Sequence, residues 1–265
     1  MLSIVATPIG NLDDISARAL QTLKEADVIA CEDTRRTRIL LSHFGIPKPP
    51  FFISYRQGTE QNTGEYMLRL LGEGRKVALC SDGGYPGISD PGYRLVSLAA
   101  ERGIEYQVIP GASAVDVALL MSGLPTSSYT FKGYPPRRPG VLRRFFEEEK
   151  DMPHTLIIFE SPFRVGATLA VALEVLGDRR AAVCIELTKK FERVSRGFLK
   201  QLNQEFAGMK IKGEVTIVIA GNNPKFANSD IIPEESLREY PSPQSSPPSG
   251  EEGSECSRFL PKRWE

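Results

Sequence analysis

The segment from Ser81 to Gly92 combines a flexible backbone with acidic side chains. Its twelve residues include four glycines, two prolines and two aspartates, Asp82 and Asp90, and they follow an apolar run at residues 77–80 that is typical of a buried strand. Glycine-rich turns at the carboxyl end of a strand leave backbone amides free to bind a ligand. A simple turn would also explain the glycines, but the segment is longer than a connection requires. We therefore expect a ligand site here.

Further polar segments adjoin other predicted strands. They comprise residues 7–11, 32–36, 110–113, 159–164, 186–192 and 213–214. Helix capping is an alternative role for some of them, because Thr34 is suited to an N-cap and Ser161 with Pro162 is typical of a helix start. Residues 110–113 open a predicted helix whose free amides could bind a carboxylate or a ribose.

Several common site types are missing from the sequence. His43 and His154 are the only histidines, and neither lies in a pattern typical of a catalytic triad or a metal site. The phosphate-binding loop GxxxxGKS/T and the dinucleotide fingerprint GxGxxG are also absent. A nucleotide-like ligand would therefore be held by backbone amides and a few carboxylates.

Short apolar strands alternate with amphipathic helices from residue 2 to about residue 112, which predicts a parallel sheet covered on both faces. The following half has a different pattern, and its strand at residues 193–198 is expected to pair antiparallel. The sequence thus predicts an α/β fold with two α/β domains, a parallel sheet in residues 1–115 and a mixed sheet in residues 116–221. Residues 222–265 are rich in proline and serine, and we expect a disordered tail.

Charge and cysteine usage limit the functional classes. Lys and Arg total 33, as do Asp and Glu, so any contact with a polyanion must be local. Cys31, Cys80 and Cys184 lie in apolar strand-like runs without a CxxC pair, which indicates core residues in a reducing compartment. The sequence starts with a strand rather than a leader and holds no run long enough to span a membrane. We expect a cytoplasmic protein without a metal or a membrane partner.

These segments together resemble the tetrapyrrole methylase superfamily, the class III S-adenosylmethionine-dependent methyltransferases. They are most similar to its branch of 16S rRNA (cytidine-2′-O)-methyltransferases, over residues 2–221. The resemblance lies in the order of six motifs, at residues 7–11, 32–35, 81–92, 110–113, 160–164 and 186–192. It implies two α/β domains with a cofactor cleft between them, a homodimer, and 16S rRNA in the small ribosomal subunit as substrate.

The resemblance also implies site residues. The S-adenosylmethionine pocket would be lined by Pro8, Gly10, Asp82, Gly84, Tyr85, Ser113, Ala114, Phe159, Leu187, Gly213 and Thr216. Contacts with RNA are expected from two basic clusters on loops and one further arginine, namely Arg35, Arg36, Arg38, Arg137, Arg138 and Arg164. Arg143 and Arg144 also belong to the second cluster, around a loop predicted at Pro135 and Pro136. For each single residue, a solvated helix face is the alternative. The chain departs from the family pattern at residues 83–86, where Tyr85 is expected to narrow the pocket.

Methyl transfer to a ribose hydroxyl needs a group that removes its proton. The candidates are Glu32, Glu160, Glu186 and Lys189, and the sequence does not choose among them. Two other functions stay open. One is a methyltransferase of the same superfamily that acts on a tetrapyrrole or another small molecule or protein, and the other is a ribosome-associated binding protein without turnover.

Overall fold

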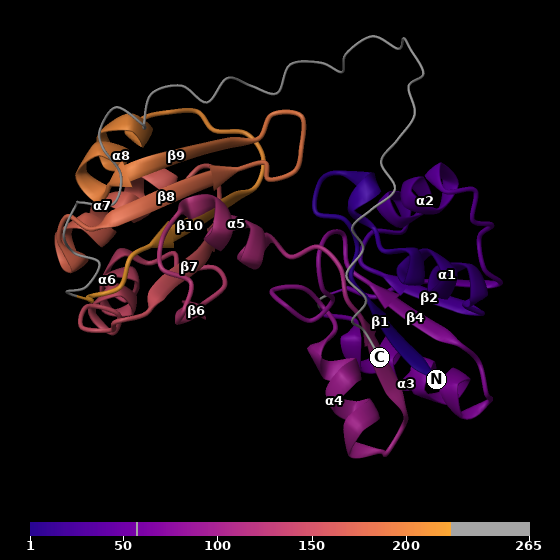
Figure 1. The fold of residues 1–265 in the computed structure, drawn as a ribbon. Helices are drawn as coiled ribbons and strands as arrows, with labels where there is room; N and C mark the ends of the chain where they lie inside the picture. The colour runs from indigo at the N-terminus through magenta and orange to yellow at the C-terminus, as the bar shows by residue number, and fades with distance from the viewer. Residues whose placement is uncertain (57, 224–265) are drawn as a thin grey trace, which may run out of the picture. The chain divides into compact units, whose positions relative to one another are not determined.

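The computed structural model describes residues 1–56 and 58–223, and the predicted tail falls almost entirely outside these residues. The first half alternates strands with helices, as its periodicity predicts (Figure 1). The strands are β1 (Leu2–Val5), β2 (Val28–Cys31), β3 (Phe51–Ser54), β4 (Val77–Cys80) and β5 (Tyr106–Ile109). The helices are the 3₁₀ turn η1 (Leu12–Asp14), α1 (Ala17–Glu25), α2 (Thr34–His43), α3 (Glu60–Gly72) and α4 (Tyr93–Glu101).

All five strands of the first sheet are parallel, in the order β3-β2-β4-β1-β5. Alternate residues of the buried strands face opposite sides, so the sheet has two cores. Strand β1 shows this alternation, because Leu2 packs with α3 and α4 whereas Val5 packs with α1 and α2. Figure 1 shows these two helix pairs on opposite faces of the sheet. The parallel sheet covered on both faces is confirmed.

The connections after β1 and β4 lie on opposite faces of the sheet. The chain leaves β1 through α1 toward β2, and it leaves β4 through α4 toward β5 in the other direction. Adjacent strands whose connections diverge in this way form a topological switch point, and ligands of open α/β sheets bind outside the carboxyl ends of such strands. The Gly-rich segment after β4 therefore lies where the fold leaves a crevice.

The second half forms a mixed sheet in the order β6-β7-β10-β8-β9. Its strands are β6 (Tyr129–Phe131), β7 (Thr155–Glu160), β8 (Arg180–Ile185), β9 (Arg193–Phe198) and β10 (Val215–Ile219), and its helices are α5 (Ala114–Ser122), α6 (Pro139–Glu147), α7 (Val165–Leu176) and α8 (Leu199–Phe206). Strand β6 runs parallel to β7, whereas the remaining pairs are antiparallel. The antiparallel pairing of β9 is confirmed.

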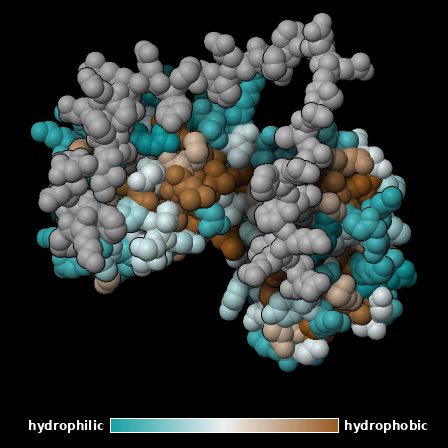
Figure 2. Space-filling view, in the orientation of Figure 1, coloured by the Kyte–Doolittle hydropathy of each residue, from teal (hydrophilic) through white to brown (hydrophobic). Residues whose placement is uncertain are grey.

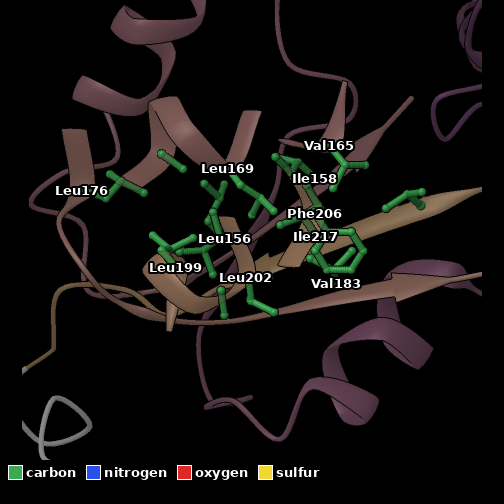
Figure 3. Packing of buried hydrophobic residues seen from close by; sticks show 14 of the residues in the cluster. Leu156, Ile158, Val165, Leu169, Leu176, Val183, Leu199, Leu202, Phe206 and Ile217 are labelled. Carbon is green, nitrogen blue, oxygen red and sulfur yellow. The ribbon is translucent and has the colours of Figure 1, made fainter. Parts of the chain in front are cut away.

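Helices α6, α7 and α8 cover one face of this sheet. Figure 3 shows Leu169 of α7 and Phe206 of α8 packed with Ile217 of β10, and all three are almost fully buried. Helix α5 covers the other face, where Ala118 packs with Val218. The predicted domain boundary between residues 115 and 116 falls inside α5, so the helix that packs on the second sheet begins directly after the last loop of the first sheet.

Two local expectations were wrong. Residues 139–147 form α6, although the prolines before it favoured a loop; Pro139 occupies the first turn, where its missing N–H costs no hydrogen bond. Helix α7 begins at Val165 with Arg164 in the N-cap position, because Ser161 instead closes a turn in which its carbonyl accepts from the Arg164 N–H at 2.9 Å.

None of the helices within residues 1–56 and 58–223 combines the length and the hydropathy that a membrane span requires.

Candidate functional site

A cavity of about 410 Å³ opens at the carboxyl ends of β1, β2, β4 and β5, at the switch point of the first sheet. Side chains from the second half, among them Tyr134, Phe159 and Thr216, complete its wall. Ligand sites for small molecules commonly have volumes of about 300–1,000 Å³. The cavity is therefore large enough for a cofactor.

Hydrogen bonds hold three loops of the first half together at the cavity. Thr7 and Gly84 each donate a backbone N–H to the carbonyl of the other, both at 2.9 Å. The Tyr85 hydroxyl accepts from the Gly111 N–H at 3.2 Å. Tyr85 therefore fastens the loop after β4 to the loop after β5 while it lines the cavity. Gly84 has φ 79°, a conformation that favours glycine.

The loop after β1 also touches the loop after β8. The Asn11 N–H donates to Thr188 Oγ1 at 3.2 Å. Gly10 lies so close to Leu187 that a Cβ atom at Gly10 would stand 2.7 Å from the Leu187 carbonyl oxygen. This contact brings Lys189 to the cavity wall.

Most residues predicted to bind the cofactor come together at this cavity. Those that line it are Pro8, Gly10, Asp82, Gly84, Tyr85, Ser113, Ala114, Phe159 and Thr216. Leu187 is buried beneath the wall, and Gly213 lies in the turn before β10, where a Cβ would collide with the Glu186 carboxylate. Neither of these two residues lines the cavity.

Three non-glycine residues of the described chain have positive φ, and all lie in loops that border the cavity. They are Ser89 (61°) in the segment after β4, and Glu186 (53°) and Thr188 (64°) in the loop after β8. Such conformations cost of order 1–3 kcal/mol and persist where the surroundings impose them. The strain of the fold is thus concentrated at this site.

Carboxylates form one side of the cavity, and Asp90 is the most perturbed of them. Burial, together with the charges of Glu32, Asp82 and Glu214, raises the pKa of Asp90 to about 7. Asp90 was noted as one of the two aspartates of the Gly-rich segment but was not among the predicted site residues. Its position in that segment was the available signal, but its approach to Glu214 depends on the fold.

Asp82 organises the start of α2. Its Oδ1 accepts from the Asp33 N–H at 2.9 Å, and its Oδ2 lies 3.6 Å from Arg36 Nε. Asp33 in turn caps the helix, because its carboxylate accepts from the Arg35 N–H at 2.8 Å. The expected cap, Thr34, is instead the first residue of the helix. Hydrogen bonds from Arg35 hold the pKa of Asp33 well below its usual range.

Glu160 lies outside the cavity and is fully buried. Its carboxylate accepts from the Ser161 N–H at 2.7 Å and from the Thr168 hydroxyl, and it lies 3.3 Å from Arg164. Arg164 also donates to the carbonyl oxygens of Pro135 and Pro136. These contacts stabilise the loops around β7, so they favour a structural role for both Glu160 and Arg164 rather than catalysis and RNA contact.

The other base candidates are held in polar contacts. Lys189 Nζ donates to Glu186 at 2.8 Å and to Glu214 at 3.1 Å. Burial alone would lower the pKa of Lys189, but these two hydrogen bonds raise it, so the amine stays protonated and cannot accept a proton. Glu32 lines a separate small hollow beside Asp82, and burial raises its pKa.

The predicted basic residues are spread over two segments. Arg36 lines the cavity, Arg35 pairs with Asp33, and Arg38 is exposed on α2. Arg137 and Arg138 are exposed directly before α6. Nearby Arg143 lies on α6, where it pairs with Glu174, and not in a loop as expected.

The three cysteines of the described residues are buried and free, as predicted. Burial raises the pKa of Cys31 to about 11 and that of Cys184 to about 12. They remain neutral thiols, which excludes them as nucleophiles at neutral pH.

The family model of the Tetrapyrrole (Corrin/Porphyrin) Methylases matches residues 1–203. The chain is 46% identical over 230 residues to "Ribosomal RNA small subunit methyltransferase I" of Halalkalibacterium halodurans, which covers 87% of this chain and 79% of the relative. The protein of the same name from Thermotoga maritima is 43% identical over 220 residues, covering 83% and 98%.

Solved structures share the fold at low sequence identity. A cobalt precorrin-4 methyltransferase superposes with a TM-score of 0.63 at 17% identity, covering 83% of this chain and 94% of that chain. A diphthine synthase superposes with a TM-score of 0.62 at 18% identity, covering 83% and 89%. These likenesses establish the two-domain α/β architecture.

Proposed function

The chain belongs to the tetrapyrrole methylase family, and on that premise we propose that it transfers a methyl group from S-adenosylmethionine to the ribose 2′-oxygen of a cytidine in 16S rRNA. The observation that carries this proposal is the cavity at the β1/β4 switch point, in a chain 46% identical to a ribosomal RNA methyltransferase. The small ribosomal subunit, in the cytoplasm, is the substrate particle.

The residues present fit S-adenosylmethionine. Its apolar parts match the aliphatic and aromatic wall formed by Ile9, Leu40 and Phe159, and its positively charged groups match the carboxylate of Asp82. Glycines at positions 83 and 84 leave room for the ligand to approach the backbone. When bound, the cofactor supplies an electrophilic methyl group on a positively charged sulfur.

The protein's main task is alignment, because the displacement requires oxygen, carbon and sulfur in line. The loops tied by Thr7, Gly84 and Tyr85 form a rigid base on which a ligand can be oriented. Tyr134 and Phe159 close the cavity from the second half, with their ring centroids 5.7 Å apart. These aromatic rings reduce the access of water to the reacting groups.

RNA would be positioned through its phosphates. Arg36 and Arg38 on α2, and Arg137 and Arg138 before α6, expose guanidinium groups on segments next to the cavity-lining residues. Phosphate contacts fix the orientation of a nucleic acid but carry no sequence information. Because the whole chain has no net charge, we expect this local charge to provide most of the electrostatic attraction.

We also propose that the protein forms a homodimer. Figure 2 shows apolar side chains gathered around the region of α5, and Leu120 of this helix is 72% exposed. Exposed apolar surface of this kind favours association with a second copy.

Tritiated methyl transfer to small ribosomal subunits from cells that lack this gene tests the function. We expect label on one ribose 2′-oxygen of 16S rRNA.

Asp82→Ala should weaken cofactor binding about tenfold, or ~1.4 kcal/mol, because Arg36 and Asp33 lose their partner at the wall of the cavity. Asp151→Ala, at an exposed aspartate in the turn after α6, is the control and should bind normally.

The alternatives give different results in the same assay. Label on a small molecule or a protein, with none on RNA, would show a different acceptor. Absence of both cofactor binding and methyl transfer would support a binding protein without turnover.

A further inference from the structure

Asp90 is presented to the cavity by a rigid segment. Ser89 before it has φ 61°, and Pro91 after it has a restricted φ. Gly92 packs so closely on the same loop that a Cβ there would stand 2.7 Å from the Gly87 nitrogen. Asp90 itself is half-buried and lines the cavity, so its backbone position is determined by the loop.

The surroundings of Asp90 are acidic and partly apolar. The charges that act on it come from Glu32 after β2, Asp82 after β4 and Glu214 before β10, while Tyr134 lies across the same cavity. The two basic residues that line the cavity in the described chain already have acidic partners, Arg36 with Asp82 and Lys189 with Glu186 and Glu214. Neither of these two basic side chains therefore forms an ion pair with Asp90.

We propose that Asp90 is the general base of the methyl transfer and accepts the proton of the attacking ribose hydroxyl. The assignment rests on the proposed function. The 2′-oxygen forms a bond to the methyl carbon, and the bond between that carbon and sulfur breaks with its electron pair remaining on sulfur. The hydroxyl proton passes to a carboxylate oxygen of Asp90, so charge and atoms balance.

The environment suits this task better than those of Glu160 and Glu186, and Glu32 lines a separate hollow rather than the cavity. A base works best when its pKa is near the working pH, and burial beside like charges raises the pKa of Asp90 to about 7. Glu160 is fully buried outside the cavity. Glu186 accepts from Lys189 and from the Glu214 N–H, and these bonds, outweighing the effect of burial, keep its pKa below the usual value.

The first test compares Asp90→Asn with the wild type on small ribosomal subunits. We expect kcat to fall about 10²- to 10⁴-fold, the usual contribution of a general base. Cofactor affinity by calorimetry and KM for the subunit should change less than about threefold. Glu73→Gln, at an exposed carboxylate after α3, is the control for loss of one negative charge.

The second test is the pH dependence. Asp90 must be ionised to accept a proton, so kcat/KM should rise as the pH increases through about 7. Glu214→Gln removes a like charge and should move this rise to lower pH, whereas Glu73→Gln should leave it in place. NMR titration of ¹³C-labelled aspartate carboxyls, with Asp90→Asn identifying the signal, measures the same pKa without turnover.

Three results would overturn the assignment. They are an Asp90→Asn variant with near-normal kcat, a variant whose only defect is cofactor binding, and an Asp90 carboxyl that titrates below pH 5. A wild-type protein that methylates no RNA would instead overturn the proposed function, and this assignment with it.

Discussion

Gly10 lies where the loop after β1 meets the loop after β8. A Cβ atom at this position would stand 2.6 Å from Thr188 Oγ1 and 2.7 Å from the Leu187 carbonyl oxygen. Distances under 3 Å cannot be accommodated without movement, and the carbonyl belongs to a backbone segment that is already strained at Thr188. The absence of a side chain at Gly10 thus permits the close approach that completes the cavity wall.

Gly10→Ala should therefore separate the two loops and weaken cofactor binding at least tenfold, about 1.4 kcal/mol. Calorimetric titration with S-adenosylmethionine measures the effect. Gly140→Ala is the matched control, because a Cβ at this helical position meets no atom within 4 Å. Alanine also favours a helix, so the control should bind normally and be equally or more stable. Equal affinity of both variants would show that the contact does not shape the site.

Among the single elements, helix α8 shows how apolar residues at helical spacing form the core of the second domain. Leu199, Leu202 and Phe206 follow one another at helical spacing and are almost fully buried, and they pack on α7 and the sheet (Figure 3). Gly166 of α7 meets the end of α8 so closely that a Cβ there would stand 2.9 Å from the Phe206 carbonyl oxygen. The Phe206 side chain is buried in the core that α7 and α8 form with strands β7, β8 and β10.

Phe206→Ala should lower the free energy of unfolding by about 3–5 kcal/mol, because it removes a buried ring and leaves a cavity. Chemical denaturation followed by circular dichroism measures the change. Phe163→Ala makes the same substitution at a residue that is 91% exposed, and its effect should stay within about 0.5 kcal/mol. Similar losses from both variants would contradict this description of the core.

At the scale of the whole molecule, α5 carries an apolar surface toward solvent. Val115, Ala118 and Leu119 pack in the core of the second domain, whereas Leu120 is 72% exposed. Of the neighbouring residues, Asp116 is also exposed, whereas Val117 and Met121 are partly buried against the same core. The proposed homodimer would bury Leu120.

Leu120→Asp should convert the dimer into a monomer, because it would place an unpaired carboxylate in an apolar interface. Size-exclusion chromatography with light scattering measures the mass. Val141→Asp on α6, at a residue 44% exposed, is the control and should keep the wild-type mass. A monomeric wild type, or a Leu120→Asp variant that remains dimeric, would contradict the proposed interface.

The α/β class and most of the elements could be predicted from the sequence, since these follow from local periodicity and turn chemistry. The alternation through residue 112 predicted the parallel sheet, and the Gly-rich segment after β4 predicted a cavity-lining loop. Helix α6 was missed because the prolines before it suggested a loop, although Leu142 and Phe146 were spaced for burial on one side.

Which polar residues lie close together could not be predicted from the sequence, because it depends on the fold. It buried Glu160 with Arg164 outside the cavity, and it placed Glu214 before β10 close enough to act on Asp90 after β4. Both outcomes depend on strand order and on packing between distant segments, because burial and charge act through space and not along the chain. Sequence patterns therefore located the loops of the site, and the fold assigned the chemistry of each side chain.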